Sequence, residues 1–193
     1  MNICVYGAAS DEIDKVYIKD VEALGEKMAK RGHGLIFGGG AGGMMGAVAR
    51  GVYKNGGNIV GVVPTFFNVD GILFEHCNDM IRTETMRERK QIMEDRAEAF
   101  IMTPGGIGTF EEFFEILTLK QLGRHQKPIV VLNTDDYYSH MLEMLDRAID
   151  QKFMTESARK LWYITKDADD ALNYIEDYKQ ESFNILEIRK MKK

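Results

Sequence analysis

The sequence predicts a doubly wound α/β fold, in which helices flank a mostly parallel sheet of about seven strands. Short apolar runs alternate with longer amphipathic runs along the chain. The short runs are apolar on both faces, which is typical of parallel strands that helices cover on both sides. Glycine-rich turns follow two of the apolar runs. These three observations together favour the doubly wound class over bundles and sandwiches.

Each predicted strand is short, apolar and bounded by glycine, proline or polar residues. In chain order the predicted strands are residues 2–7, 34–39, 58–64, 79–84, 99–104, 127–133 and 162–165. Pro64 and Pro104 end two of them, at positions where a missing amide costs no ladder hydrogen bond. The segments between the strands should therefore form the helices.

The helical segments show apolar residues at a spacing of three or four. In the first, Val21, Leu24 and Met28 recur at this spacing and Gly32 ends the helix. In chain order the predicted helical segments are residues 14–32, 39–56 (a glycine loop and then a helix), 85–99, 109–122, 137–151 and 167–178. Residues 65–77 are predicted to be irregular.

Length and composition predict one domain spanning residues 1–193, because a chain of 193 residues can bury a full core. A net charge of −5 argues against broad binding to nucleic acid or to anionic membranes. We expect the basic residues at about 184–193 to form a solvated tail.

Cys4 and Cys77 lack the spacing of a disulfide framework or zinc site. Without a signal peptide or a long apolar run, the expected location is cytoplasmic.

The fold class places the ligand site beyond the carboxyl ends of the strands, where both glycine-rich turns lie. In the first turn, Gly38, Gly40 and Gly43 fit G-x-G-x-x-G, which alone is a weak signal. NAD binding would favour an acidic residue at the end of the next strand, and residues 58–67 contain none. Neither turn has the Gly-Lys-Ser/Thr sequence of a P-loop.

The second turn, PGGIGT, predicts a phosphate site at the start of a helix. Glycines let successive amides face a ligand, and amides at a helix start lack partners within the helix. The helix dipole adds to their attraction for an anion. Gly105, Gly106, Gly108 and Thr109 would form this site, with the Thr109 hydroxyl as a further donor. The alternative is a tight turn in which Thr109 caps the helix.

The helix after this turn carries a carboxylate that a bound phosphate would repel. Phe110, Phe113, Phe114 and Leu117 mark its predicted buried side, with Glu112 at the edge of that stripe. Such a carboxylate is tolerated when a cation lies beside it or when it takes part in the chemistry.

The cation is predicted on the helix at 85–99, where Met86, Met93 and Ala97 define an inward stripe. Arg89 and Lys90 lie within about 60° of Met86 on a helical wheel. Cations on an inward face are costly unless an anion pairs with them. The alternative is that their stems are buried while their charged groups reach water.

These residues resemble a known family. The segments MRERK (86–90) and PGGIGTFEE (104–112) resemble the M-H-x-R-K and P-G-G-x-G-T-x-x-E signatures of the Lonely Guy (LOG) family. Members are cytokinin riboside 5′-monophosphate phosphoribohydrolases, earlier labelled lysine decarboxylases. The resemblance continues through residues 38–46 and 120–138 and covers about residues 2–155. Arg87 replaces the family's histidine, and Gly7-Ala8-Ala9-Ser10 departs from its usual C-G-S-S turn.

The resemblance implies a Rossmann-like homodimer that cleaves the N-glycosidic bond of a nucleoside 5′-monophosphate. The products would be a free base and ribose 5-phosphate, with no metal or organic cofactor. Arg89 and Glu112 match the family's catalytic residues. The substrate-binding residues expected from the motifs and the two glycine turns are Gly38, Gly39, Gly40, Met86, Lys90, Gly105, Gly106, Ile107, Gly108, Thr109, Phe110, Glu111 and Thr118.

Other interpretations remain open at this point. A non-catalytic nucleotide sensor or carrier would need the phosphate site but not Glu112. A decarboxylase would need pyridoxal phosphate and a Schiff-base lysine, for which Lys90 is the candidate. The acid that protonates the departing base could be Glu75, Glu111 or Glu115, or no acid at all. The four histidines show no ligand spacing.

Overall fold

A computed structural model describes residues 1–67 and 71–180, so the predicted basic tail at 184–193 lies outside the described residues. One sheet contains seven strands in the order β4-β3-β2-β1-β5-β6-β7, and all neighbouring strands pair in parallel. The strands are β1 (Asn2–Tyr6), β2 (Gly34–Phe37), β3 (Ile59–Pro64), β4 (Asp79–Thr83), β5 (Ala99–Met102), β6 (Ile129–Leu132) and β7 (Tyr163–Thr165). This confirms the predicted Rossmann-like, doubly wound class.

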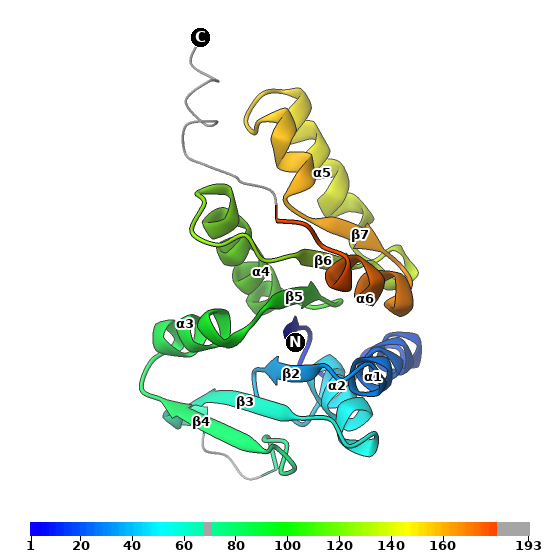
Figure 1. The fold of residues 1–193 in the computed structure, drawn as a ribbon, viewed down its shortest axis with the longest axis vertical. Helices are drawn as coiled ribbons and strands as arrows, with labels where there is room; N and C mark the ends of the chain where they lie inside the picture. Colours follow the sequence, from blue (N-terminus) through cyan, green and yellow to red (C-terminus); the bar gives the residue numbers. More distant parts are fainter. Residues whose placement is uncertain (68–70, 181–193) are drawn as a thin grey trace.

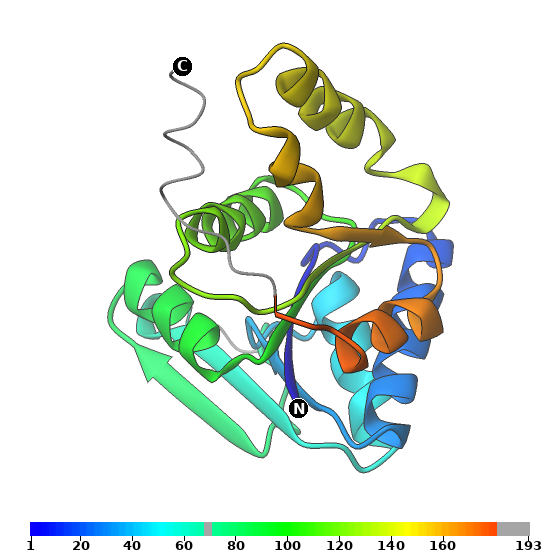
Figure 2. The same ribbon diagram turned by 45° about the horizontal axis from the view of Figure 1, so that its top comes forward.

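Helices cover both faces of the sheet (Figures 1 and 2). Those in the described residues are α1 (Lys15–Lys30), α2 (Gly43–Lys54), α3 (Met86–Arg96), α4 (Ile107–Gln121), α5 (Ser139–Asp150) and α6 (Ala168–Glu176). Core residues of α1, α2 and α6 pack together on one face, and those of α3, α4 and α5 pack on the other. Three short 3-10 helices, which the sequence did not predict, are η1 (Thr65–Phe67), η2 (Thr134–Asp136) and η3 (Glu156–Lys160).

The alternation of side chains along β1 explains the two cores. Ile3 and Val5 pack with α1, α2 and α6, whereas Cys4 and Tyr6 pack with α3, α4 and α5. All four are buried. Because β1 pairs with both β2 and β5, it lies where the order of the strands reverses. Doubly wound folds bind ligands beyond the carboxyl ends of the strands at this point.

The helix that follows the PGGIGT turn differs in two ways from its prediction. Helix α4 begins at Ile107 rather than residue 109, so Thr109 lies in its first turn and is not its cap. Gly106 is the N-cap residue and offers no side chain to the helix. Phe114 was predicted to be buried and is 38% exposed, because the inward face follows Phe113, Ile116 and Leu117. None of the described helices has the length and apolar character needed to cross a membrane.

His125 lies between α4 and β6 and should make the fold sensitive to mild acid. Its Nε2 donates to the Ile116 carbonyl at 2.8 Å, and its Nδ1 accepts from the Lys127 amide at 3.2 Å. Burial lowers the pKa of this imidazole from 6.5 to about 4. As the pH falls from about 6.5 to 4, His125 takes up a proton in the unfolded chain but stays neutral in the folded chain. The free energy of unfolding therefore falls over this window.

We expect the free energy of unfolding to fall by up to about 1.4 kcal/mol per pH unit from this residue between pH 6 and 5. Urea unfolding at both pH values measures the slope. His125→Gln should flatten it, whereas His140→Gln, whose side chain is 98% exposed, should leave it unchanged. An equally steep slope in both variants would contradict this assignment.

Candidate active site

A pocket of about 470 Å³ opens beyond the carboxyl ends of β1, β2, β3 and β5. The chain segments that form it leave the sheet on both sides of the point where the strand order reverses. It is lined by Gly7, Ala8, Ala9, Ser10, Gly38, Met45, Val63, Phe67, Ile72, Leu73, Met86, Arg89, Gly106, Gly108, Thr109 and Glu112. The location is the one that the fold class predicts for a ligand.

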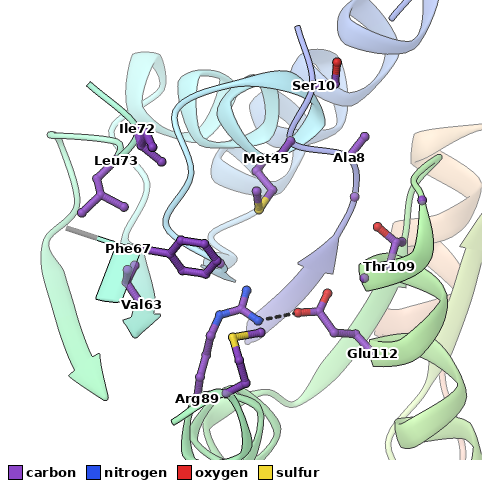
Figure 3. Close-up of a pocket in the computed structure, with 16 residues that line it drawn as sticks. Ala8, Ser10, Met45, Val63, Phe67, Ile72, Leu73, Arg89, Thr109 and Glu112 are labelled. Carbon is purple, nitrogen blue, oxygen red and sulfur yellow. Dashed lines mark hydrogen bonds and ion pairs between the residues drawn. The ribbon is translucent and has the colours of Figure 1, made fainter. Parts of the chain in front are cut away.

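The pocket has a polar and an apolar side (Figure 3). Glu112 and Thr109 project from α4, and Arg89 reaches Glu112 from α3. The apolar side chains lie across the cavity from α4 and come from α2, from β3 and from the chain between β3 and β4; they are Met45, Val63, Phe67, Ile72 and Leu73. The pocket therefore suits a ligand with one charged end and one flat or apolar end.

Arg89 and Glu112 form an ion pair at the polar end. Nη1 of Arg89 donates to Oε1 of Glu112 at 2.6 Å, and Nε donates to the Val62 carbonyl at 3.0 Å. The side chains are only 8% and 12% exposed. Thr85 caps α3 through its hydroxyl, which accepts from the Glu88 amide, and this fixes the start of the helix. Arg89 thus lies on the inward face of α3, as predicted.

The environment of Glu112 opposes its charge. Burial raises the pKa of this carboxyl above its usual 4.5, and the adjacent Arg89 guanidinium lowers the pKa again without cancelling the effect of burial. A buried carboxylate that is only partly neutralised stabilises a positive charge strongly, because little water screens it. The pair can therefore stabilise a cation that develops in the pocket.

Gly38 makes room for the guanidinium. A Cβ atom at this position would lie 2.2 Å from Nη2 of Arg89 and 3.0 Å from the Met45 sulfur. A side chain there would push against Nη2 of the guanidinium, whose Nη1 and Nε are held by Glu112 and Val62. The glycine at the end of β2 thus leaves room for the ion pair, whatever ligand enters the pocket.

The first turn of α4 offers unpartnered amides to the pocket. Gly106 provides no cap, and the first helical hydrogen bond runs from the Phe110 amide to the Gly106 carbonyl. Within the described chain, the amides of Ile107, Gly108 and Thr109 have no hydrogen-bond partner. A Cβ on Gly106 or Gly108 would meet no atom within 4 Å. Free amides beside open space at the start of a helix fit an anionic group.

The other glycine turn differs, because the protein itself occupies the start of α2. The Gly43 amide donates to Oδ1 of Asp11 at 2.7 Å. The amides of Met44 and Met45 both donate to the Ala8 carbonyl, at 2.8 and 3.3 Å. An anion would have to displace the Asp11 carboxylate to bind there. Of the two helix starts that follow the glycine turns in the described chain, the start of α4 is the one that keeps its amides available.

The predicted site residues fall into two groups. Those that line the pocket are Gly38, Met86, Arg89, Gly106, Gly108, Thr109 and Glu112. Those that lie outside its lining are Gly39, Gly40, Lys90, Gly105, Ile107, Phe110, Glu111 and Thr118. Ile107 is 88% exposed, and Phe110 packs edge-on against Tyr138. The Thr118 hydroxyl donates to the Phe114 carbonyl at 2.7 Å.

Lys90 forms ion pairs on the outer side of α4, with Glu111 and with Glu115, the latter at 2.8 Å. Burial alone would lower the pKa of this amine, but the hydrogen bonds to the two carboxylates raise it above its usual value. The amine therefore stays protonated at neutral pH. A protonated amine is not a nucleophile, which argues against Lys90 as a Schiff-base lysine.

Sequence reasoning did not assign the residues of the β1 turn or most of the apolar side. Ala8, Ala9 and Ser10 line the pocket although they differ from the family's usual turn. Their position directly after a predicted strand was the sequence feature that could have assigned them to the ligand site. Phe67 and Leu73 were noted as possible pocket residues and do line it, whereas Phe74 is buried and Phe66 is exposed outside the lining.

The fold and this pocket define a doubly wound α/β protein with a ligand site at the reversal of the strand order. In the described residues no group of three or more His, Cys, Asp or Glu side chains is arranged to hold a metal ion. The groups that converge are the buried ion pair and the free amides of α4.

The chain belongs to the LOG family. Residues 45–175 match the family model described as "Possible lysine decarboxylase". The chain is 35% identical over 176 residues to cytokinin riboside 5′-monophosphate phosphoribohydrolase LOG2 of Arabidopsis thaliana, covering 91% of this chain and 83% of that protein. It is 36% identical over 176 residues to the probable phosphoribohydrolase LOGL5 of Oryza sativa subsp. japonica, covering 91% and 72%.

Solved structures share the fold at lower identity. The molybdenum cofactor binding protein of Rippkaea orientalis superposes with a TM-score of 0.70 at 20% identity, covering 91% of this chain and 94% of that one. The molybdenum cofactor carrier protein of Chlamydomonas reinhardtii gives 0.68 at 22% identity, covering 91% and 95%. These similarities support the architecture, and function must be argued from the pocket.

Proposed function

We propose that the protein is a nucleoside 5′-monophosphate phosphoribohydrolase. It would hydrolyse the N-glycosidic bond of AMP or an N6-substituted adenosine 5′-monophosphate to the free base and ribose 5-phosphate. The observation that carries the proposal is the buried Arg89–Glu112 pair, joined at 2.6 Å, in the same pocket as the uncapped start of α4. The relatives named above as phosphoribohydrolases support the same reaction.

The phosphate would bind the free amides of Ile107, Gly108 and Thr109, with the Thr109 hydroxyl as a further donor. Anchoring at this end directs the ribose toward Glu112, one turn further along α4. Cleavage of the glycosidic bond develops positive charge on the ribose at C1′ and O4′. The Glu112 carboxylate would stabilise this charge or take a proton from the attacking water.

Arg89 would keep Glu112 ionised and oriented rather than bind the base. Two of its donors are committed, one to Glu112 and one to the Val62 carbonyl. The base would then occupy the apolar side of the pocket, against Met45, Phe67 and Leu73. None of Glu75, Glu111 and Glu115 lines the pocket, so we propose that the base leaves with a proton from water.

The direct test is to incubate the purified protein with AMP and with an N6-substituted AMP, and to separate the products by chromatography. Release of adenine or the substituted base, with an equal amount of ribose 5-phosphate, supports the proposal. Nucleotide binding without base release would favour the sensor or carrier instead.

We also propose that the protein acts as a homodimer. Phe66, Ile107 and Phe114, 61%, 88% and 38% exposed, leave apolar surface near the pocket that a second copy could cover. Light scattering on the purified protein tests this, and a monomeric mass would contradict it.

Gly108→Ala should separate stability from substrate binding. The added methyl group meets no protein atom within 4 Å and replaces a helical glycine, so the variant should be more stable by up to about 1 kcal/mol. The same methyl group would occupy the proposed phosphate site and raise KM for AMP about tenfold. Thermal unfolding and steady-state kinetics measure the two effects. A rise in Tm with an unchanged KM would place the phosphate elsewhere.

A further inference from the structure

The loop that leads into α4 has three consecutive carbonyls that are each held from outside the loop. The Tyr138 hydroxyl donates to the Thr103 carbonyl at 2.7 Å, and the Ala8 amide donates to the Pro104 carbonyl at 3.1 Å. The Tyr137 hydroxyl donates to the Gly105 carbonyl at 2.8 Å. Two of these three bonds come from neighbouring tyrosines in the segment between β6 and α5.

A bond that fixes a carbonyl also fixes the direction of the amide in the same peptide. In a planar trans peptide, the carbonyl of one residue and the amide of the next point in opposite directions. The Tyr137 bond to the Gly105 carbonyl therefore fixes the direction of the Gly106 amide. The Ala8 bond to the Pro104 carbonyl turns the Gly105 amide the opposite way, toward Tyr138. Pro104 has no amide hydrogen, so the Tyr138 bond to the Thr103 carbonyl positions the start of the loop and directs no amide. Gly106 lines the pocket and Tyr137 does not, so the bond acts from behind the loop.

The segment that carries the tyrosines is itself firmly placed. Asp135 and Asp136 have positive φ angles of 51° and 58°, which non-glycine residues seldom adopt unless the surroundings impose them. The Asn133 side chain accepts from the Tyr138 amide at 2.7 Å. Lys166 forms an ion pair with Asp136 at 2.6 Å. This segment directs both hydroxyl groups at a loop more than 25 residues earlier in the chain.

The hydroxyl of Tyr138 is a dependable donor. The side chain is 1% exposed, and its burial raises its pKa well above the usual value, so it remains protonated. Tyr137 is 44% exposed, and its ring packs edge-on against Tyr138 at 4.8 Å and against Tyr17 at 5.9 Å. Neither tyrosine lines the pocket.

We propose that Tyr137 and Tyr138 are positioning residues. Tyr137 turns the Gly106 amide toward the pocket and Tyr138 holds the start of the loop, so that the Gly106 amide and the first turn of α4 face the bound phosphate. This inference rests on the proposed function for the identity of the ligand. It assigns a role to the NTDDYY segment, which the proposed chemistry itself does not use. The two tyrosine hydroxyl bonds act on phosphate binding rather than on the charge that develops at C1′.

The test compares Tyr137→Phe and Tyr138→Phe with Tyr163→Phe. The control loses a tyrosine hydroxyl bond of similar length, 2.9 Å to Asp170, on the distant strand β7. Ribose 5-phosphate binding is measured by calorimetry, and kcat and KM are measured with AMP. We expect Tyr137→Phe to weaken ribose 5-phosphate binding about tenfold and to raise KM similarly, with kcat within about threefold of the wild type.

Tyr138→Phe removes a buried hydrogen bond and can fail to fold, whereas Tyr137→Phe alters an exposed side chain and keeps the inference testable. The inference is overturned if Tyr137→Phe binds ribose 5-phosphate as tightly as the wild type, or if the control weakens binding equally. It is also overturned if the wild type does not bind ribose 5-phosphate. The wild type could bind ribose 5-phosphate and release no base from AMP, while Tyr137→Phe weakens that binding. In that outcome the proposed reaction is wrong and the positioning role of the tyrosines is supported.

Discussion

Glu112→Gln is expected to lower kcat for AMP by about 10²-fold or more while the protein stays folded. The amide has nearly the same shape and can still accept the hydrogen bond from Nη1 of Arg89, which spans 2.6 Å in the wild type. What the variant loses is the negative charge. If that charge stabilises the ribosyl cation, the loss appears mainly in kcat, because the charge on the ribose develops only in the transition state.

Initial rates of adenine release, followed by chromatography, measure this effect. Glu143→Gln provides the matched control, because it makes the same chemical change on α5 at a side chain that is 73% exposed. The control should retain the wild-type rate. A Glu112→Gln variant with near-normal turnover and a normal Tm would remove this carboxylate from the mechanism.

Much of the fold could be predicted because the strand signal is local. Runs such as AFIM at 99–102 are apolar on both faces, and only a sheet covered on both sides buries them fully. The boundaries of α4 could not be predicted as well. A glycine cannot cap a helix with its side chain, so no residue type before Ile107 marks it as the start of the helix.

The inward position of Arg89 could be predicted from the helical wheel, because Arg89 lies close to the apolar Met93 on it. The structure buries both side chains. Its contact with Glu112 required the two helices to be placed in space. The occupation of the α2 start by Asp11 depends on a contact 32 residues away along the chain, and no local pattern shows such a contact. Lys90 shared the inward wheel position but pairs with Glu111 and Glu115 on the outer side of α4.

Replacing Arg89 should change the pH dependence of the reaction as well as its rate. Burial raises the pKa of Glu112, and Arg89 provides the largest opposing effect. In Arg89→Met, which fills most of the space without the charge, the largest lowering effect is lost and the raising effect of burial dominates. The pKa of Glu112 then rises further, and a larger fraction of the carboxyl is protonated at neutral pH.

The acidic limb of kcat/KM should therefore move to higher pH in Arg89→Met, and the rate at pH 7 should fall by about 10²-fold or more. In Arg89→Lys the acidic limb of kcat/KM should lie between those of the wild type and Arg89→Met. The lysine restores a charge but cannot bond to both Glu112 and the Val62 carbonyl. Rates of base release from AMP between pH 5 and 9 measure the shift.

The sign for stability follows from the same pKa. A carboxyl whose folded pKa lies above its unfolded value contributes stability below pH 4.5, which is lost as the pH rises through the folded pKa. Ionisation of Glu112 is thus a net cost to the fold, and removal of Arg89 increases that cost. A variant whose rate falls while the acidic limb stays in place would show that Arg89 acts on the substrate directly and not through Glu112.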